Sequence, residues 1–249
     1  MSAPATARSA MLKIDPDAWL AGLMGRPVNR VAGPVASGAE KEAVRALAEL
    51  AAAPGFAYAR VPTAEVRLTH LLEDAGFRLV DTGITLEAAT IAGTARPGSD
   101  TRLARAGDAT AVAEIARTAF RYSRFHLDPR IPATLANEIK REWAANYFRG
   151  QRGDHMVVAE RSGSVVGFLQ LLAGKDGALT IDLIAVTEAQ RGQGLASDMI
   201  RFAARECGAP ALLRVGTQAA NVASLRLYER LGFTVAGTSH VFHLHAPVA

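Results

Sequence analysis

The chain has 249 residues, of which 49% are hydrophobic and 21% are charged, with a formal net charge of +4. This composition is typical of one large or two small globular domains and excludes a disordered chain. A single cysteine, Cys207, excludes an intrachain disulfide and fits a cytoplasmic protein; its place on an apolar helix stripe predicts burial. No apolar run reaches the roughly 18 residues of a membrane span, and residues 1–13 lack a signal-peptide core, so a short disordered lead is expected there. Basic residues are scattered without interleaved aromatics, which disfavours nucleic-acid binding and leaves a small anionic ligand.

Four elements are expected in the first part of the chain. Apolar periodicity predicts a helix over residues 41–52 and another over 65–75, which Gly76 ends. Alternating patterns predict strands over 56–61 and 77–86. The stretch 92–99 is rich in Gly, Pro, Ser and Thr, so we expect an N-terminal domain over residues 1–92, a linker over 93–100 and a second domain over 101–249.

A faint repeat links the two parts. Residues 70–77, HLLEDAGF, mirror residues 226–233, RLYERLGF, and a strand pattern follows each of them. The first part therefore resembles a partial copy of the second, with Leu72 where Tyr228 stands. We expect the N-terminal part to be non-catalytic, either extending the sheet or shaping the substrate side.

The second part alternates strands and helices. A strand is expected at 102–105, a helix capped by Asp108 up to about 121, a helix over 133–149, and a hairpin of strands 156–161 and 164–173. A strand over 178–186, a helix over 195–207 and strands over 211–217 and 234–245 complete the set. Such alternation predicts an α/β fold with a mixed, twisted sheet flanked by helices. An exposed last strand would offer an edge to a second copy, as in a homodimer.

A glycine loop lies between the strand 178–186 and the helix that follows it. Its sequence, QRGQGLA over residues 190–196, places Gly192 and Gly194 before the first helical turn. Free N–H groups of that turn carry partial positive charge, and glycines let the backbone approach an anion closely. The spacing fits neither the dinucleotide fingerprint nor the P-loop. The loop is a candidate phosphate site of another kind, and an ordinary glycine-containing turn between a strand and a helix is the alternative.

A second motif follows about thirty residues downstream. Residues 221–233, NVASLRLYERLGF, carry the pattern N-x-x-S-x-x-x-Y-x-x-x-G-F. The glycine loop and this segment, in this order and spacing, resemble the GNAT superfamily of acetyl-CoA-dependent N-acetyltransferases over roughly residues 101–245. The resemblance implies the GNAT fold, acetyl-CoA as co-substrate, and an N-terminal domain that is a partial GNAT half.

The resemblance also implies roles for particular residues. Backbone groups near Ile184, Ala185 and Val186 would hold the pantetheine arm, and Asn221 and Ser224 would order it. The pyrophosphate would bind at Arg191, Gly192, Gln193, Gly194, Leu195 and Ala196. Tyr228 would protonate the departing thiolate, since a phenol stays protonated near neutral pH; a half-buried packing role is the alternative.

The general base is less clear in the sequence. Asp182 is a carboxylate in an otherwise apolar strand, and such a group is costly without a partner. It is a candidate base, acting directly or through water, a substrate ligand, or a structural cap. A base-free route through water is the other alternative.

The stretch 120–132, FRYSRFHLDPRIP, is the best indication of the acceptor. Its candidate substrate-binding residues, which combine charge, hydrogen bonding and stacking, are Tyr122, Arg124, Phe125, His126, Asp128 and Arg130. The sequence of this stretch resembles the bacterial N-acetyltransferases of dTDP-4-amino-4,6-dideoxy sugars, including the fucosamine enzyme. The predicted acceptor is therefore a small-molecule amine on a sugar nucleotide, with no metal. Acetylation of an antibiotic or amino acid, or CoA binding without turnover, are the alternatives.

Overall fold

The computed structural model describes residues 12–36, 38–93, 100–208 and 210–247, and these form two compact units. The first unit contains the described residues up to Thr82 together with those from Ser239 onward, and the second contains Gly83–Thr238. The units therefore differ from the expected segments 1–92 and 101–249, because the ends of two strands belong to the other unit. Most of the expected linker, residues 94–99, lies outside the described residues.

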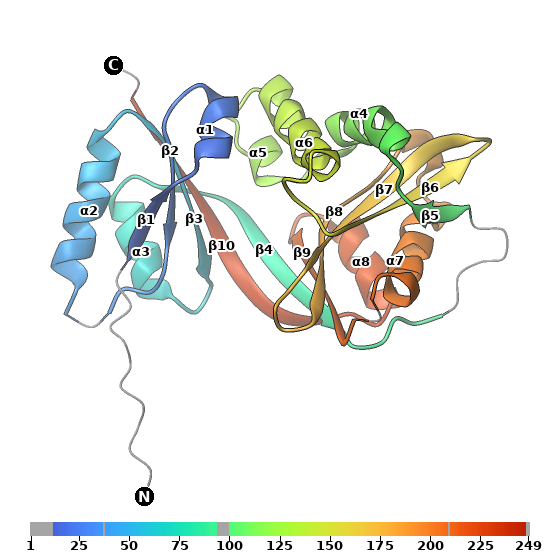
Figure 1. The fold of residues 1–249 in the computed structure, drawn as a ribbon. Helices are drawn as coiled ribbons and strands as arrows, with labels where there is room; N and C mark the ends of the chain where they lie inside the picture. The colour runs from blue at the N-terminus through green and yellow to red at the C-terminus, as the bar shows by residue number, and fades with distance from the viewer. Residues whose placement is uncertain (1–11, 37, 94–99, 209, 248–249) are drawn as a thin grey trace, which may run out of the picture. The chain divides into compact units, whose positions relative to one another are not determined.

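The first unit is a small α/β layer (Figure 1). Its elements are β1 (Lys13–Pro16), α1 (Ala18–Met24), β2 (Val28–Ala32), α2 (Glu40–Ala52), β3 (Gly55–Pro62), α3 (Val66–Asp74), the start of β4 (Arg78–Ala88) and the end of β10 (Thr234–Ala246). Strands β1 and β2 pair antiparallel, β2 and β3 parallel, and β3 and β10 antiparallel. The core joins Leu47 of α2 and Leu72 of α3 to the sheet. The first three elements have four to seven residues each, too short for a clear sequence pattern.

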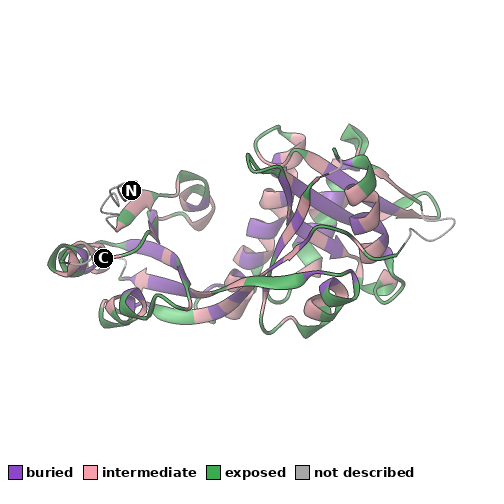
Figure 2. Cartoon of the chain, turned by 90° about the horizontal axis from the view of Figure 1, so that it is seen from below, coloured by how far each residue is buried: buried purple, intermediate pink, exposed green. Residues whose placement is uncertain are grey.

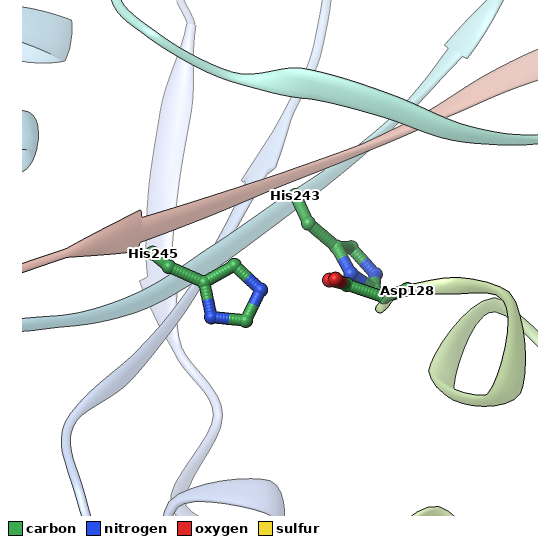
Figure 3. Close-up of side chains that lie close together, drawn as sticks. All are labelled: Asp128, His243 and His245. Carbon is green, nitrogen blue, oxygen red and sulfur yellow. The ribbon is translucent and has the colours of Figure 1, made fainter. Parts of the chain in front are cut away.

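Two histidines face one way on β10. His243 and His245 are two residues apart and extend from the same side of the strand (Figure 3). Their rings lie 6.3 Å apart, and both contact Phe56 on the neighbouring strand β3. Aromatic packing within the first unit is thus one role of these side chains.

The second unit carries the remaining elements. These are β5 (Thr101–Leu103), η1 (Ala106–Asp108), α4 (Ala109–Ala119), α5 (Arg124–Leu127), α6 (Ala133–Phe148), β6 (His155–Arg161), β7 (Ser164–Ala173), β8 (Ala178–Val186), η2 (Glu188–Gln190), α7 (Leu195–Glu206), β9 (Leu212–Gln218) and α8 (Val222–Arg230). Its strand order is β4-β9-β8-β7-β6-β5, with β8 and β9 parallel and the other neighbours antiparallel. The predicted mixed α/β architecture, with helices flanking the sheet, is confirmed.

Both faces of this sheet are covered by helices. Helices α4 and α6 lie on one face, and α7 and α8 lie on the other (Figure 1). Alternate residues of one strand serve the two faces: Val157 joins the core under α7, and Val158 joins the core under α4. The buried residues follow these inward faces (Figure 2). Cys207 is buried as expected.

The repeated segments form the same turn twice. After α3, Gly76 has φ +87° and Phe77 donates its N–H to Leu72 O at 2.9 Å; after α8, Gly232 has φ +91° and Phe233 donates to Tyr228 O at 3.0 Å. Glycine is suited to both positions because a side chain strains the left-handed conformation.

The strand after each turn pairs in the other unit. Residues Gly83–Ala88 of β4 pair with β9, and residues Ser239–Ala246 of β10 pair with β3. Strand β10 has neighbours on both sides, β3 and β4, so the expectation of an open last edge is wrong.

One expected helix cap also differs. Asp108 precedes α4 but makes no side-chain cap to it. Its carboxylate instead accepts from Arg105 N–H at 2.7 Å and from two nitrogens of Arg102 at 2.7 and 2.9 Å, because a charged partner holds it more strongly than a helix amide. In the described part of the chain, no helix is long and apolar enough to cross a membrane.

Candidate active site

A cavity of about 660 Å³ lies where two parallel strands of the second unit separate. Strands β8 and β9 pair from Ala178 and Leu212 as far as Ile181 and Val215. Beyond that point, residues 182–186 of β8 and 216–218 of β9 line the cavity. In these residues, the backbone N–H and C=O groups that would have continued the β8–β9 ladder are available to a ligand. Such groups suit the amides of a pantetheine arm.

The glycine loop closes one end of the cavity. Gly192 and Gly194 adopt φ +76° and +78°, and both line the cavity together with Leu195 and Ala196. The first backbone bond of α7 runs from Asp198 N–H to Gly194 O at 3.1 Å, so the preceding N–H groups have no partner within the helix. A Cβ added at Gly192 would meet nothing within 4 Å, which leaves open space for a phosphate.

Arg191 fixes this loop rather than reaching outward. Its Nη2 donates to Ala119 O at 2.9 Å and its Nε to Val186 O at 3.3 Å. These bonds tie the loop to the end of α4 and to the end of β8. Gln193, predicted to bind the pyrophosphate, does not line the cavity as the other loop residues do.

Helix α8 presents its polar face to the same cavity. Asn221, Ser224 and Tyr228, three or four residues apart in turn, all line it. Asn221 is also the N-cap of α8, since its Oδ1 accepts from Ser224 N–H at 3.3 Å. The spacing of these three residues in the sequence predicts a common helix face, and all three do line the cavity. Asn221 also has a structural role as the N-cap.

Tyr228 is buried and stays protonated. It is 2% exposed, and its ring packs edge-on against Phe233 at 5.4 Å. Burial raises the pKa of the Tyr228 phenol, because a phenolate would lose its hydration there. A protonated phenol in the cavity is the form that a general acid needs.

Asp182 is surrounded by donors. Arg152 donates to both of its oxygens at 2.7 Å, Trp143 Nε1 donates at 2.9 Å and Gln170 Nε2 at 3.1 Å. Its side chain is 8% exposed. Four hydrogen bonds hold this carboxylate in place, and this arrangement favours a positioning role over the base predicted from the sequence.

Lys140 is a functional candidate that the sequence analysis missed. It is buried on α6 and lines the cavity, with Nζ 4.7 Å from the ring centres of both Phe120 and Trp143. Among the described residues, no carboxylate forms an ion pair with it. Burial lowers the pKa of Lys140 to about 8, with Asp182 opposing the shift. Its place on the buried face of α6, beside Ile139 and four residues from Ala136 and Ala144, was the available signal.

The predicted acceptor segment reaches the cavity through its first half. Phe120, Arg121, Tyr122 and Ser123 line the cavity. Ser123 Oγ lies 2.6 Å from His126 Nδ1, and His126 Nε2 lies 3.0 Å from Asn137 Oδ1. Burial lowers the pKa of His126, which favours a neutral ring.

The second half of that segment does not line the cavity. Arg124 stacks on the buried Phe125 ring at 4.2 Å, and Asp128 accepts from Arg130 N–H at 2.9 Å. Of the predicted substrate residues, the structure therefore places only Tyr122 at the cavity wall. Phe125 is 1% exposed, so its ring serves packing rather than stacking on a ligand.

Known proteins are similar to this chain in sequence and in fold. Residues 110–233 match the model of the Acetyltransferase (GNAT) family. The spore coat polysaccharide biosynthesis protein SpsD of Bacillus subtilis (strain 168) is 35% identical over 140 residues, which are 55% of this chain and 48% of that protein. The chain thus spans about half the length of this curated relative.

Solved structures agree on the fold. A GCN5-related N-acetyltransferase from Sphaerobacter thermophilus matches with a TM-score of 0.62 at 15% identity, covering 96% of this chain and 78% of its own. A tandem GNAT protein from the clavulanic acid biosynthesis pathway matches with a TM-score of 0.60 at 16% identity, covering 90% and 77%. With the family model, the glycine loop and the cavity in agreement, the chain belongs to the GNAT family of acetyltransferases, which use acetyl-CoA as the acetyl donor.

Proposed function

We propose that this acetyltransferase transfers the acetyl group to the amine of a nucleotide-linked amino sugar of the dTDP-4-amino-4,6-dideoxyhexose type. The observation that carries the proposal is a single cavity lined both by the glycine loop and by the segment Phe120–Ser123. A donor and an acceptor bound in one cavity can react directly, without a covalent enzyme intermediate. The SpsD relative, a polysaccharide biosynthesis protein by name, supports a sugar acceptor.

The donor would lie along β8, with its pyrophosphate at the N-terminus of α7. The free N–H groups of the first helical turn would bind the phosphates, and Gly192 would leave them room. Backbone N–H groups near Ala185 and Val186 would polarise the thioester carbonyl, since both residues line the cavity.

Tyr228 would supply the proton for the leaving thiolate. The amine nitrogen forms a bond to the thioester carbon, the carbon–sulfur bond breaks, and the electron pair goes to sulfur. The Tyr228 hydroxyl then gives its proton to that sulfur and recovers one from solvent. Its raised pKa keeps the proton available throughout the neutral range.

The acceptor's diphosphate would bind at the arginines of the 121–130 segment. Arg121 lines the cavity, and its side chain is 58% exposed. Its contacts with Thr118 O, Phe120 O and Glu188 are all at the surface, and a ligand phosphate would replace them. Arg124, the second candidate, lies outside the cavity lining and would have to leave the Phe125 ring to reach the diphosphate. Tyr122, 43% exposed at the cavity wall, could stack on the nucleobase or sugar.

The test is CoA release from acetyl-CoA across a panel of amines. The panel sets dTDP-4-amino-4,6-dideoxyhexoses beside free amino sugars, aminoglycosides and amino acids. Turnover of the nucleotide sugars alone supports the proposal. Turnover of other amines alone would refute the sugar-nucleotide acceptor, and acetyl-CoA binding without turnover of any amine would favour a CoA-binding module.

Two arginine variants test whether this segment binds the acceptor. Arg121→Ala and Arg124→Ala should each raise the KM for the nucleotide sugar by about tenfold, a loss of roughly 1.4 kcal/mol, while the KM for acetyl-CoA stays unchanged. Arg117→Ala is the matched control, because Arg117 is exposed on α4 and pairs with Glu114. Equal effects on both substrates would count against diphosphate binding by this segment.

A further inference from the structure

We propose that Lys140 is the general base that takes the proton from the acceptor amine. This inference rests on acetyl transfer to an amine, and it does not depend on which amine the protein accepts. Lys140 and Tyr228 line the same cavity, so one side chain would remove a proton at nitrogen and the other would deliver one at sulfur.

Burial of Lys140 disfavours a fixed positive charge, although the faces of the Phe120 and Trp143 rings attract an ammonium group. The residue is 8% exposed, and the rings of Phe120 and Trp143 each lie 4.7 Å from Nζ. A lysine that serves only as a structural cation is normally paired with a carboxylate when it is buried. In the described residues, Lys140 has neither an ion pair nor a hydrogen bond to its ammonium group.

The nearest acidic group is already used. Asp182 on β8 accepts hydrogen bonds from Nε and Nη2 of Arg152, and from Trp143 and Gln170. Arg152, which precedes β6, and Arg124 on α5 add positive charge around Lys140. His126 on α5 is the other titratable group nearby, and burial keeps its ring neutral. With burial as the largest cause, these surroundings lower the pKa of Lys140 to about 8.

The resulting base suits the reaction. A substantial fraction of Lys140 is neutral at mildly alkaline pH, and a free amine accepts a proton through its lone pair. The acceptor nitrogen loses one proton to Lys140 Nζ as it forms the bond to the acetyl carbon. Lys140 becomes an ammonium, Tyr228 gives its proton to the thiolate sulfur, and exchange with solvent restores both side chains.

Asp182 is then the positioning residue behind Lys140. By accepting from Trp143 Nε1 at 2.9 Å, it fixes the indole ring that lies against Nζ. Its attraction to the ammonium also keeps the pKa of Lys140 from falling further. The carboxylate thus acts through its neighbours, and Lys140 is the group that touches the substrate.

The kinetic test compares Lys140→Met with Lys140→Arg. Methionine keeps the length and fills the buried site without charge, and arginine keeps the charge but is never deprotonated at assay pH. We expect both variants to lose about 100-fold or more in kcat and to lose the rise of kcat near pH 8, with acetyl-CoA affinity unchanged. Lys175→Met, on an exposed turn, is the matched control. If Lys140→Arg retains the activity and pH profile of the unchanged protein, Lys140 is an anion-binding cation and the proposal is refuted.

A second measurement works without any acceptor. The chain contains four lysines, Lys13, Lys41, Lys140 and Lys175, so trace labelling with acetic anhydride over a pH range can resolve each amine. We expect Lys140 to titrate near pH 8. An ordinary pKa for Lys140 would overturn the proposal even if no acceptor were known. Conversely, a failed acceptor panel would refute the proposed sugar substrate and leave this result intact.

Chemical rescue separates a base from a packing residue. Small primary amines added to Lys140→Ala should restore part of the turnover in proportion to their concentration and basicity. A variant whose defect is only structural would not respond to an added base. Absence of rescue in a folded Lys140→Ala that still binds acetyl-CoA would count against the proposal.

Discussion

Trp143 donates its indole N–H to Asp182 at 2.9 Å, and the same Asp182 oxygen receives Arg152 Nε at 2.7 Å. The one carboxylate of β8 therefore joins α6 to the segment before β6. Because the Trp143 ring lies 4.7 Å from Lys140 Nζ, this polar cluster also fixes the surroundings of the proposed base. In the proposed mechanism, the acceptor side therefore depends on a cluster of four side chains, Lys140, Trp143, Arg152 and Asp182, rather than on Asp182 alone.

Asp182→Asn should reduce turnover and move the rise of kcat to a pH below 8, because the charge of Asp182 holds up the pKa of Lys140. Asparagine keeps the shape but turns an N–H group toward one of the present donors, which should cost about 1–3 kcal/mol of folding free energy. Urea unfolding measures the stability, and the pH profile of kcat measures the role. Asp176→Asn, which removes the charge of the more exposed pair with Arg214, is the control and should change stability much less. If Asp182→Asn abolishes the pH dependence and Lys140→Met preserves it, Asp182 is the base.

Tyr228→Phe should lower kcat by about 100-fold or more and leave acetyl-CoA affinity unchanged. Phenylalanine retains the ring that packs against Phe233, so the fold should persist. Since burial raises the pKa of Tyr228, the unchanged protein should show no loss of activity from phenol ionisation below about pH 10. Rapid-quench kinetics and calorimetry supply the two readouts. Full activity in the variant would assign the thiolate proton to solvent.

Gly192→Leu should weaken acetyl-CoA binding by roughly tenfold or more. A leucine side chain there would enter open space at the glycine loop, where we place the pyrophosphate, and would also strain the backbone at φ +76°. Gly177→Leu is matched for this strain, because Gly177 also has φ +76° with nothing within 4 Å and lies outside the cavity lining. Calorimetry on both variants separates loss of ligand space from backbone strain. Equal affinity in the two would remove the pyrophosphate assignment.

Lys140→Met should stabilise the fold most at neutral pH. The folded-state pKa of Lys140 is lowered from 10.5 to about 8, so between these values the unfolded chain binds a proton that the folded chain does not. Stability of the unchanged protein therefore rises as the pH increases through this window, and the penalty below pH 8 is about 3 kcal/mol. Denaturant unfolding from pH 7 to pH 10 should show the advantage of the variant shrinking by that amount. An advantage that is constant with pH would mean that Lys140 has an ordinary pKa.

The sequence was sufficient to predict the elements and helix faces that depend on a local residue pattern. The strand over residues 178–186 agrees with β8 at both ends, and the helix start at Leu195 follows from the glycine loop, whose conformation only glycine adopts without strain. The common face of Asn221, Ser224 and Tyr228 follows from helical spacing alone. These features depend on residues within a few positions of each other, and so they are readable along the chain.

Pairing over long distances was not readable in the same way. Strand β4 pairs with β9 and strand β10 pairs with β3, and the two strands of each pair are separated in sequence by about the length of a domain. The repeated turn after α3 and α8 was visible in the sequence, but these pairings were not. A turn motif fixes the local chain reversal, but the choice of neighbouring strand depends on which surfaces bury together.

By itself, the sequence determined the α/β class from its local patterns. Through two short motifs that resemble the GNAT superfamily, it also indicated the acetyl-CoA site and the acid candidate Tyr228. Only the tertiary structure decided the roles around the acceptor. Asp182 and Arg152 are 30 residues apart, and Trp143 and Asp182 are 39 apart, so the hydrogen bonds that occupy the carboxylate form only in the fold. Lys140 is an ordinary helical lysine in the sequence. Its burial, with no ion pair to a carboxylate among the described residues, lowers its pKa toward that of a base.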